Sequence, residues 1–349
     1  MSLNIEKIKN VLVLMPDKHM GDLVLSLSAI SALNEFFKEK TFYLVADSAY
    51  AEIIETISGL DNVLYYPRKL LKKKSFIKRL AIQFDFLRQL RNTSPDISID
   101  LHGGTASSLM SFLSGASLRI GKSTAKRPYL YNMKVDLLQD RHKIYGYAEI
   151  ASSAGAQSRE GIHRIKASWA SISELKNILI ENGLTIEKPI VCIHPGAGVI
   201  YKKWTEQGFA DISDWLTSKG FQVIFVGAGD DLEVIIKIMN LLKHNAYNLG
   251  GKLSIGQLIA LIETSSLYIG NDSGPMHLAE AVDIPVIALF GPADEGRWGP
   301  LSEESIVLRG EEPCEDCKRK DCQYEFKCIR LLSSKDLKIA IEKLIRHPD

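Results

Sequence analysis

Short apolar runs alternate with stretches of helical periodicity along most of the chain. The first apolar run covers residues 10–15, and Leu, Ile and Phe side chains then recur every three or four residues from 23 to 37. Apolar side chains with that spacing share one face of a helix, whereas a short continuous run is typical of a buried strand. Alternation of the two predicts an α/β fold with parallel sheets.

This alternation occurs twice, which predicts two domains. Between about residues 115 and 170 it is weak, and scattered Gly, Ser and basic residues replace it. We expect a first domain over residues 1–170, a second over 171–332 and a last amphipathic helix within 333–349, with a ligand cleft between the domains. The expected strands are residues 10–15, 41–46, 63–66 and 96–101, then 190–193, 221–226, 246–249, 267–270 and 285–290.

The two halves differ in charge. The chain has 349 residues and a net charge of +1, but residues 1–165 hold 23 Lys and Arg against 16 Asp and Glu, and residues 166–349 hold 20 against 26. Different ligands are therefore expected for the two halves, and nucleic acid is not expected on the acidic one. No apolar run approaches the roughly 20 residues of a membrane span, and residues 11–15 are too few for a signal peptide. These patterns predict a cytoplasmic protein.

Polar turns follow three strands of the second domain. The sequence NDSGP occupies residues 271–275, HPGAG occupies 194–198 with Lys202 close behind, and Gly291-Pro292 follows the last strand. The start of a helix attracts phosphate, glycine lets the backbone approach a ligand, and lysine supplies a point charge. Because the turns share the carboxyl edge of a parallel sheet, they predict a phosphate site. HPGAG alone is equally consistent with a tight turn beside exposed lysines.

Several candidate residues also have a purely structural interpretation. Asp22 opens the long first helix, where a carboxylate either caps the helix or takes a proton from an attacking hydroxyl, and position alone favours capping. Asp272 can likewise act only as a helix cap. His277 lies in the helix after NDSG, where most histidines are packed, and a ligand role stays open for His102 and His194 because both end strands.

Two nucleotide-binding patterns are incomplete or missing. GAG at residues 227–229 imitates a dinucleotide fingerprint, but Leu232 stands where the third glycine should be. We interpret this segment as a strand-to-helix turn capped by Asp230. No P-loop pattern occurs, which argues against a kinase or NTPase.

A basic run precedes the amphipathic helix expected at residues 75–91. Its basic residues are Arg68, Lys69, Lys72, Lys73 and Lys74, followed by Lys78 and Arg79 inside the helix. The apolar side of that helix carries Phe76, Leu80, Phe84, Leu87 and Leu90. Such a run is usually a solvated face, but it could also rest on anionic head groups.

Four of the five cysteines lie within fifteen residues. Cys314, Cys317, Cys322 and Cys328 have the spacing C-x2-C-x4-C-x5-C. Because disulfides are disfavoured in the cytosol, four thiolates on one loop suggest a structural zinc or iron site. Reduced cysteines without metal are about as consistent with the pattern.

Five motifs, taken in order, resemble glycosyltransferase family 9, the ADP-heptose:lipopolysaccharide heptosyltransferases. They are Gly21-Asp22 after the first strand, PGAG at 195–198, Lys202-x-Trp204, NDSGPMHLAEA at 271–281 and FGPAD at 290–294. The resemblance covers residues 10 to about 345, and its DSG-x-x-H-x-A helix is specific while the GD pair alone is weak. Cysteine clusters before the last helix are also similar to those of many family members.

The resemblance implies a GT-B fold, in which two Rossmann-like domains face a central cleft. The first domain would bind the acceptor, the second the nucleotide sugar, and the last helix would cross back to the first domain. The implied reaction is an inverting, metal-independent transfer of heptose from ADP-heptose to a lipopolysaccharide inner-core acceptor, in the EC 2.4 class. The partners are then an ADP-sugar and a lipid-linked acceptor, with peripheral contact at the cytoplasmic face of the inner membrane and no nucleic acid.

Site residues follow from the matching motifs. Asp22 matches the general base, and Lys202 matches the lysine that binds the donor phosphates. The remaining donor-binding residues implied by the resemblance are Asp272, Ser273, Gly274, His277, Gly196, Gly291 and Pro292. Lys203 and Thr205 stand where relatives commonly have other residues, so another nucleotide sugar or acceptor is an alternative. Further alternatives are an epimerase of the same fold and a non-catalytic sugar-nucleotide-binding protein.

Overall fold

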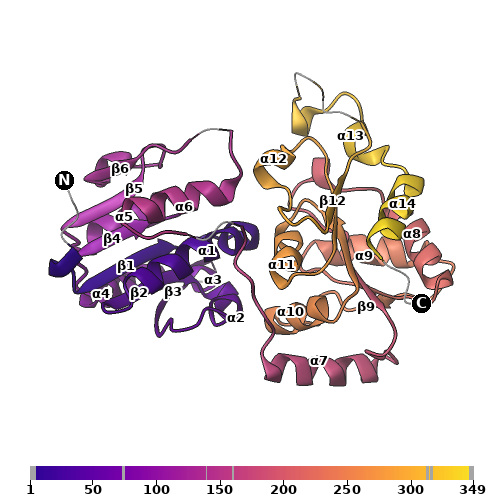
Figure 1. Ribbon diagram of the computed structural model, residues 1–349, viewed down its shortest axis with the longest axis horizontal. Coiled ribbons are helices and arrows are strands. Elements are labelled where there is room, and N and C mark those ends of the chain that lie inside the picture. Colours follow the sequence, from indigo (N-terminus) through magenta and orange to yellow (C-terminus); the bar gives the residue numbers. More distant parts are fainter. Residues whose placement is uncertain are drawn as a thin grey trace. The chain divides into compact units, whose positions relative to one another are not determined.

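The computed structural model describes residues 5–72, 75–138, 140–158, 161–311, 314 and 317–345, and it divides the chain into two compact units (Figure 1). The first unit is Met1–His163 and the second is Arg164–Asp349. Each unit contains a six-stranded sheet whose described strand pairs are all parallel. The predicted α/β class with two Rossmann-like units is therefore confirmed.

The sheet of the first unit has the order β3-β2-β1-β4-β5-β6. Its strands are β1 (Asn10–Met15), β2 (Thr41–Asp47), β3 (Asn62–Tyr66), β4 (Ile97–Asp100), β5 (Leu118–Lys122) and β6 (Met133–Val135). Its α-helices are α1 (Met20–Phe36), α2 (Ala51–Ile54), α3 (Arg68–Lys72), α4 (Phe76–Asn92), α5 (Thr105–Leu113) and α6 (Lys143–Ser153). The direction of winding reverses between β1 and β4, and open α/β sheets bind ligands at such a switch point.

The second unit repeats this topology with the order β12-β11-β10-β7-β8-β9. Its strands are β7 (Ile190–His194), β8 (Gln222–Phe225), β9 (Tyr247–Asn248), β10 (Leu267–Asn271), β11 (Val286–Leu289) and β12 (Ser305–Leu308). Its α-helices are α7 (Trp169–Glu181), α8 (Glu206–Ser218), α9 (Asp231–Met239), α10 (Ile255–Glu263), α11 (Gly274–Val282), α12 (Glu295–Trp298), α13 (Lys327–Arg330) and α14 (Ser334–Leu344). Here the switch point lies between β7 and β10.

The central strands are fully buried, whereas the outer strands are only partly so. Residues 11–15 of β1 and all of β7 are buried, which explains their continuous apolar runs. Three strands were not predicted, and all three lie toward the sheet margins and carry partly exposed side chains: β5, β6 and β12. The stretch from 115 to 170 therefore holds two strands and α6, although its hydrophobic pattern is weak.

The last helix, α14, contributes to the core of the second unit. Its Leu337, Ala340 and Ile341 are buried in the same apolar cluster as Phe209 and Leu216 of α8. Its return to the first domain stays a prediction. Among the described residues, no helix is both long and apolar enough to cross a bilayer.

Candidate active site

Asp22 lies in the first turn of α1, beside the switch point of the first sheet. One of its oxygens, Oδ1, accepts the hydroxyl hydrogen of Tyr147 on α6 at 2.8 Å. Its other oxygen, Oδ2, is 4.0 Å from Nδ1 of His19, and the side chain is 20% exposed. The carboxylate is thus oriented by another helix and remains accessible, as a proton acceptor has to be.

Asp17, in the loop between β1 and α1, gathers two histidines around a buried carboxylate. Its Oδ1 is 3.0 Å from Nδ1 of His19, and its Oδ2 is 2.8 Å from Nδ1 of His102, which follows β4. Burial alone would raise the pKa of Asp17, but hydrogen bonds and charge from His102 and His19 outweigh it and hold that pKa far below its usual range. The hydrogen bond to Asp17 also raises the pKa of His19.

A lysine stands close to these carboxylates. Lys122 ends β5, and burial together with the charge of Lys143 lowers the pKa of Lys122, although Asp100, Asp22 and Asp17 partly oppose the effect. Gly103, at a left-handed φ of +68°, leaves room for this side chain, because a Cβ there would lie 2.3 Å from its Cε. The loop that carries Gly103 is therefore shaped around a half-buried cation.

Asp100 holds the loop that carries Gly103 in place by hydrogen bonds to its backbone. It is fully buried, and burial raises its pKa despite hydrogen bonds from the backbone N–H groups of His102 and Gly103. The Tyr131 hydroxyl donates to its Oδ2 at 2.5 Å. We name the group formed by Asp17, His19, Asp22, His102, Lys122 and Tyr147 the first-unit edge.

Three members of the first-unit edge also have metal-ligand spacing. Ligand atoms of Asp17, His19 and Asp22 all lie within 4.8 Å of one another. A metal binds a neutral imidazole, so a metal here would compete with the proton that Asp17 favours on His19.

In the second unit, Lys202 and Asp272 form an ion pair at the start of α11. Nζ of Lys202 lies 2.6 Å from Oδ2 of Asp272, whose side chain is 5% exposed. Ser273 is the N-cap residue and Gly274 the first residue of the nine-residue helix, but the Ser273 side chain makes no capping bond. The backbone N–H groups at the mouth of α11 and one ammonium therefore occupy the same small region.

Asn271 ties the neighbouring loops to this helix start. It is completely buried, and its Nδ2 donates to the carbonyl oxygen of Pro195 at 2.7 Å. Its Oδ1 accepts the backbone N–H of Trp204 at 3.1 Å. Asn271 thus fixes both the HPGAG loop and the segment that carries Lys202. The sequence pattern identifies Asn271 only as part of a turn.

His194 links three loops of the same unit. Its Nδ1 is 3.1 Å from Oγ of Ser273, and its Nε2 is 3.3 Å from Oδ2 of Asp231 at the start of α9. Burial would raise the pKa of Asp231, but its hydrogen bond and charge interaction with His194 outweigh burial and lower it. Asp230 is the N-cap residue of α9, as predicted, but its side chain makes no capping bond, and Oδ2 of Asp231 accepts the Ala228 N–H instead.

Two glycines are required by close packing around this site. A Cβ on Gly196 would lie 2.0 Å from Oδ1 of Asp231, and a Cβ on Gly291 would lie 2.4 Å from the carbonyl oxygen of Tyr201. Gly291, followed by Pro292, therefore presses the β11 turn against the segment just before Lys202. We name the group formed by His194, Gly196, Lys202, Asn271, Asp272 and Ser273 the second-unit edge.

His277 lies one turn into α11 and is buried. Its Nδ1 is 3.9 Å from Oε2 of Glu280, whose Oε1 accepts the backbone N–H of Ser302 at 3.1 Å. These contacts fit a packed histidine that helps to hold the helix. A supporting role for His277 in donor binding stays a prediction.

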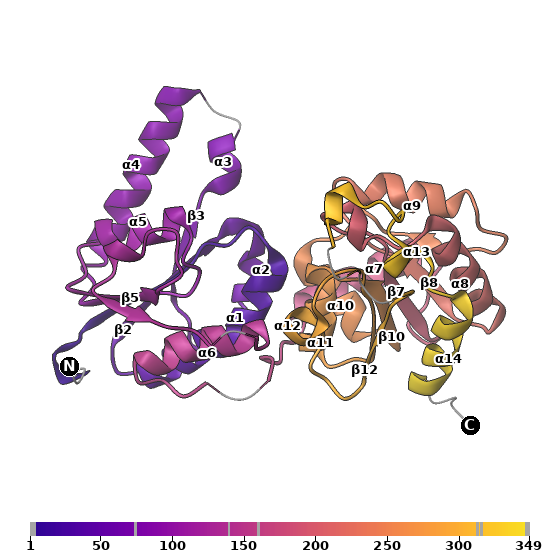
Figure 2. The same cartoon turned by 90° about the horizontal axis from the view of Figure 1, so that it is seen from above.

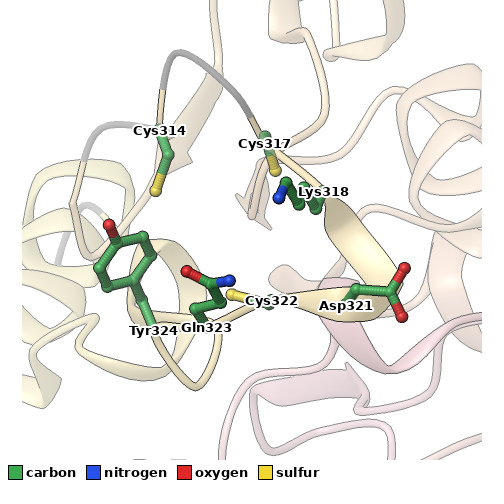
Figure 3. A pocket seen from close by; sticks show the side chains of 7 residues that line it. All are labelled: Cys314, Cys317, Lys318, Asp321, Cys322, Gln323 and Tyr324. Atoms are coloured by element: carbon green, nitrogen blue, oxygen red, sulfur yellow. The ribbon is translucent and has the colours of Figure 1, made fainter.

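Three of the clustered cysteines surround a pocket of about 400 Å³ (Figure 3). Cys314, Cys317 and Cys322 line it together with Lys318, Asp321, Gln323 and Tyr324. Cys328 is buried on α13, and burial raises its pKa, followed by the effect of the other three cysteines nearby. All four are free thiols. Within the described chain, no three of their sulfur atoms lie within 4.8 Å of one another.

Comparison with known proteins relates most of the chain to one family. The model of glycosyltransferase family 9 (heptosyltransferase) matches residues 83–327. Lipopolysaccharide heptosyltransferase 3 of Escherichia coli is 25% identical over 338 residues, which cover 93% of this chain and 96% of that protein.

Solved structures share the fold. A glycosyl transferase family 9 protein from Veillonella parvula superposes with a TM-score of 0.82 at 22% identity, covering 96% of this chain and 97% of the other. The E. coli heptosyltransferase WaaC with ADP superposes with a TM-score of 0.75 at 19% identity, covering 96% and 99%. The likeness to these two structures confirms the predicted GT-B fold.

Proposed function

Because the chain belongs to glycosyltransferase family 9, the heptosyltransferases, we propose that this glycosyltransferase moves a heptose from ADP-heptose to an acceptor in the inner core of lipopolysaccharide. The full-length relationship to a lipopolysaccharide heptosyltransferase and the shared fold with a heptosyltransferase solved with ADP support this donor and acceptor. The observation that carries the proposal is the Lys202–Asp272 pair at the mouth of α11.

The second-unit edge would hold the diphosphate of the donor. The N–H groups at the start of α11 point their partial positive charge at the place where negative charge grows as ADP leaves. Asp272 keeps the Lys202 ammonium at that place, 2.6 Å away, before the donor arrives. We propose that this charge compensation is sufficient for departure of ADP without a metal ion.

The first-unit edge would activate the acceptor. Asp22 takes the proton of the acceptor hydroxyl, the freed oxygen attacks the anomeric carbon, and the bond from that carbon to the β-phosphate oxygen of ADP breaks. One direct displacement of this kind inverts the configuration at the anomeric carbon. Tyr147 orients Asp22, while Asp17 and its two histidines fix the loop in front of it.

Location follows from the acceptor. We propose that the protein works in the cytoplasm, on a lipid-linked acceptor at the inner membrane. This placement suits the basic first half of the chain, because an inner-core acceptor with phosphates and acidic sugars is anionic.

A structural metal at the cysteine pocket is a further part of the proposal. Cys314, Cys317, Cys322 and Cys328 supply four soft donors, which suit zinc or iron in a tetrahedral site. The metal would cross-link the loop before α13 to that helix and would take no part in sugar transfer.

The test of function is mass-resolved transfer from ADP-heptose to a heptose-free core acceptor. Lys202→Ala removes the ammonium and is expected to lower kcat/KM by about 10- to 100-fold, as expected for a hydrogen bond to a charged group. Lys252→Ala, at an exposed lysine of the same unit, serves as control. Equal transfer by Lys202→Ala and wild type would refute the proposed site. A thermal-shift panel of ADP-, UDP- and GDP-sugars tests the donor separately.

A further inference from the structure

The first half of α4 is not covered by the rest of the first unit. Figure 2 shows α4 extending away from the sheet, with α3 beside it. Only Phe86 and Leu90, in its second half, are buried, and Phe86 packs edge-on against the Tyr66 ring at a centroid distance of 5.3 Å. Every residue from 75 to 81 is exposed. The helix is therefore anchored at one end and free at the other.

The free end carries a stripe of large apolar side chains. Phe76, Ile77, Leu80 and Phe84 are 74%, 79%, 50% and 73% exposed. At about 3.6 residues per turn, the four fall within roughly 100° of the circumference of the helix. This stripe differs from the buried face at Phe86 and Leu90. The apolar spacing predicts Phe76 and Phe84 on one side of the helix with Leu90, but only Leu90 of these three enters the core. Exposed apolar patches on soluble proteins commonly mark an interaction surface.

The surroundings of the stripe are strongly basic. Residues 68–79 contain seven Lys and Arg and no Asp or Glu. Lys78 and Arg79 lie on α4 beside the stripe and are exposed. A second copy of the chain would bring like charges together here, whereas an anionic lipid surface complements them. Phe and Leu on one face of a helix with Lys and Arg beside them are typical of helices that lie in a membrane interface.

The first residue of α3 is bonded to residues that adjoin the first-unit edge. Nε of Arg68, the first residue of α3, is 2.7 Å from Oδ2 of Asp47, and its Nη2 donates to the carbonyl oxygen of Pro16. Pro16 immediately precedes Asp17. The neighbouring helix α3, which Figure 2 shows beside α4, is thus connected through one guanidinium to the loop that precedes Asp22.

We propose that α4 forms a docking element for an anionic bilayer, with Phe76, Ile77, Leu80 and Phe84 inserted below the head groups and Lys78 and Arg79 among them. The binding itself does not depend on the proposed function. The role of that binding does, because it would keep the first-unit edge at the membrane that carries a lipid-linked acceptor. Apolar insertion and head-group attraction both contribute to such binding.

Vesicle flotation of the full chain tests the proposal. Wild type is expected to float with vesicles of phosphatidylethanolamine and phosphatidylglycerol but not with vesicles of phosphatidylcholine. High salt should reduce the fraction that floats with the anionic vesicles. The exposed positions tolerate polar residues, so the F76S/I77S/L80S/F84S variant should fold. It should bind the anionic vesicles more weakly than wild type by a factor of about ten or more. K78E/R79E should also bind more weakly. The W169S/I180S variant, which changes two exposed apolar residues of α7 that are 83% and 71% exposed, should float like wild type.

A depth measurement and a soluble substrate complete the design. In the Phe84→Trp variant, the fluorescence of the new tryptophan should shift to the blue when anionic vesicles are added. Bromine-labelled lipid should quench that fluorescence. Transfer to a delipidated core acceptor should be equal for wild type and F76S/I77S/L80S/F84S, and this keeps docking separate from catalysis. The proposal is overturned if wild type does not float, or if the apolar variant floats equally well. It is also overturned if the stripe instead holds two copies together, so that only self-association changes in the variant.

Discussion

Tyr147 and Asp22 lie 125 positions apart in the chain, yet the tyrosine hydroxyl donates to Oδ1 of Asp22 at 2.8 Å. Burial, followed by the charge of Asp22, raises the pKa of Tyr147 well above its usual value, so the phenol keeps its proton. The hydroxyl is therefore a permanent donor that fixes the direction of the carboxylate.

Replacement of Tyr147 by Phe should slow transfer without weakening donor binding. The ring remains, while the hydrogen bond that orients Asp22 is lost, and we expect kcat to fall by about 3- to 10-fold. Steady-state kinetics with a soluble core acceptor measure this, and Tyr145→Phe on the same helix is the matched control. An unchanged kcat would show that Asp22 does not need this bond.

His19 should make the stability of the protein depend on pH. Its folded-state pKa is raised from 6.5, first by the hydrogen bond to Asp17, so its contribution is fully present below about pH 6.5 and is lost as the pH rises through the folded value. The stability lost in His19→Gln should therefore be larger at acidic than at alkaline pH. Urea midpoints of both proteins across this range give the answer. A difference that grows with pH would contradict the assignment.

Gly196→Ala should disrupt the second-unit edge. Its Cβ would lie 2.0 Å from Oδ1 of Asp231, whereas a Cβ on Gly198, two residues away, would meet nothing within 4 Å. We expect about 1–3 kcal/mol of lost stability and weaker ADP binding for Gly196→Ala, and little change for Gly198→Ala. Thermal unfolding and calorimetric titration with ADP compare the pair. Equal behaviour of the two variants would mean that the loop relaxes freely.

Asn271→Asp keeps the shape of the side chain but replaces the donor of the bond to Pro195 with an oxygen. A buried oxygen would then face the Pro195 carbonyl, and we expect a loss of about 1–3 kcal/mol in stability. Affinity for ADP should fall as well, because Asn271 also holds the Trp204 backbone. Asn245→Asp, at an exposed loop position between α9 and β9, is the control. Chemical denaturation with and without ADP separates the two effects.

The cysteine pocket predicts a bound metal and a local response to its removal. Protein purified under reducing conditions should contain about one zinc or iron per chain by elemental mass spectrometry, and far less in Cys317→Ser. Chelation should make the 314–328 loop more sensitive to protease, while transfer activity with a soluble acceptor is retained. Metal-free wild-type protein with an unchanged digestion pattern would dismiss the site.

The sequence predicted the elements whose signals are local. The apolar runs of β1, β7 and β10 and the turns that follow them are read from neighbouring residues, and the structure places Asp22, Lys202 and Asp272 at the switch points expected of such sheets. The partly exposed strands β5, β6 and β12 escaped prediction because polar residues interrupt β5 and β6, and the apolar run of β12 is only three residues long.

Contacts that depend on strand order were out of reach. Tyr147 bonds to Asp22 only because α6 returns beside α1, and Lys122 comes within reach of its charge because β5 lies two places from β1. Nothing near either residue in the sequence indicates this. His102 was a partial clue, since it follows β4, the strand that pairs with β1. The strand order of a doubly wound sheet, combined with the polar residues after each strand, would have predicted that His102 lies near Asp17.

Both units arrange their strands in the same order, with the first and fourth adjacent. Each therefore assembles its polar edge from its own residues, on its own side of the junction between His163 and Arg164. Recombination at that junction would carry either edge intact into a chimera. Under the proposed function, related enzymes could in this way exchange the half proposed to select the acceptor while inheriting an unaltered half proposed for the nucleotide.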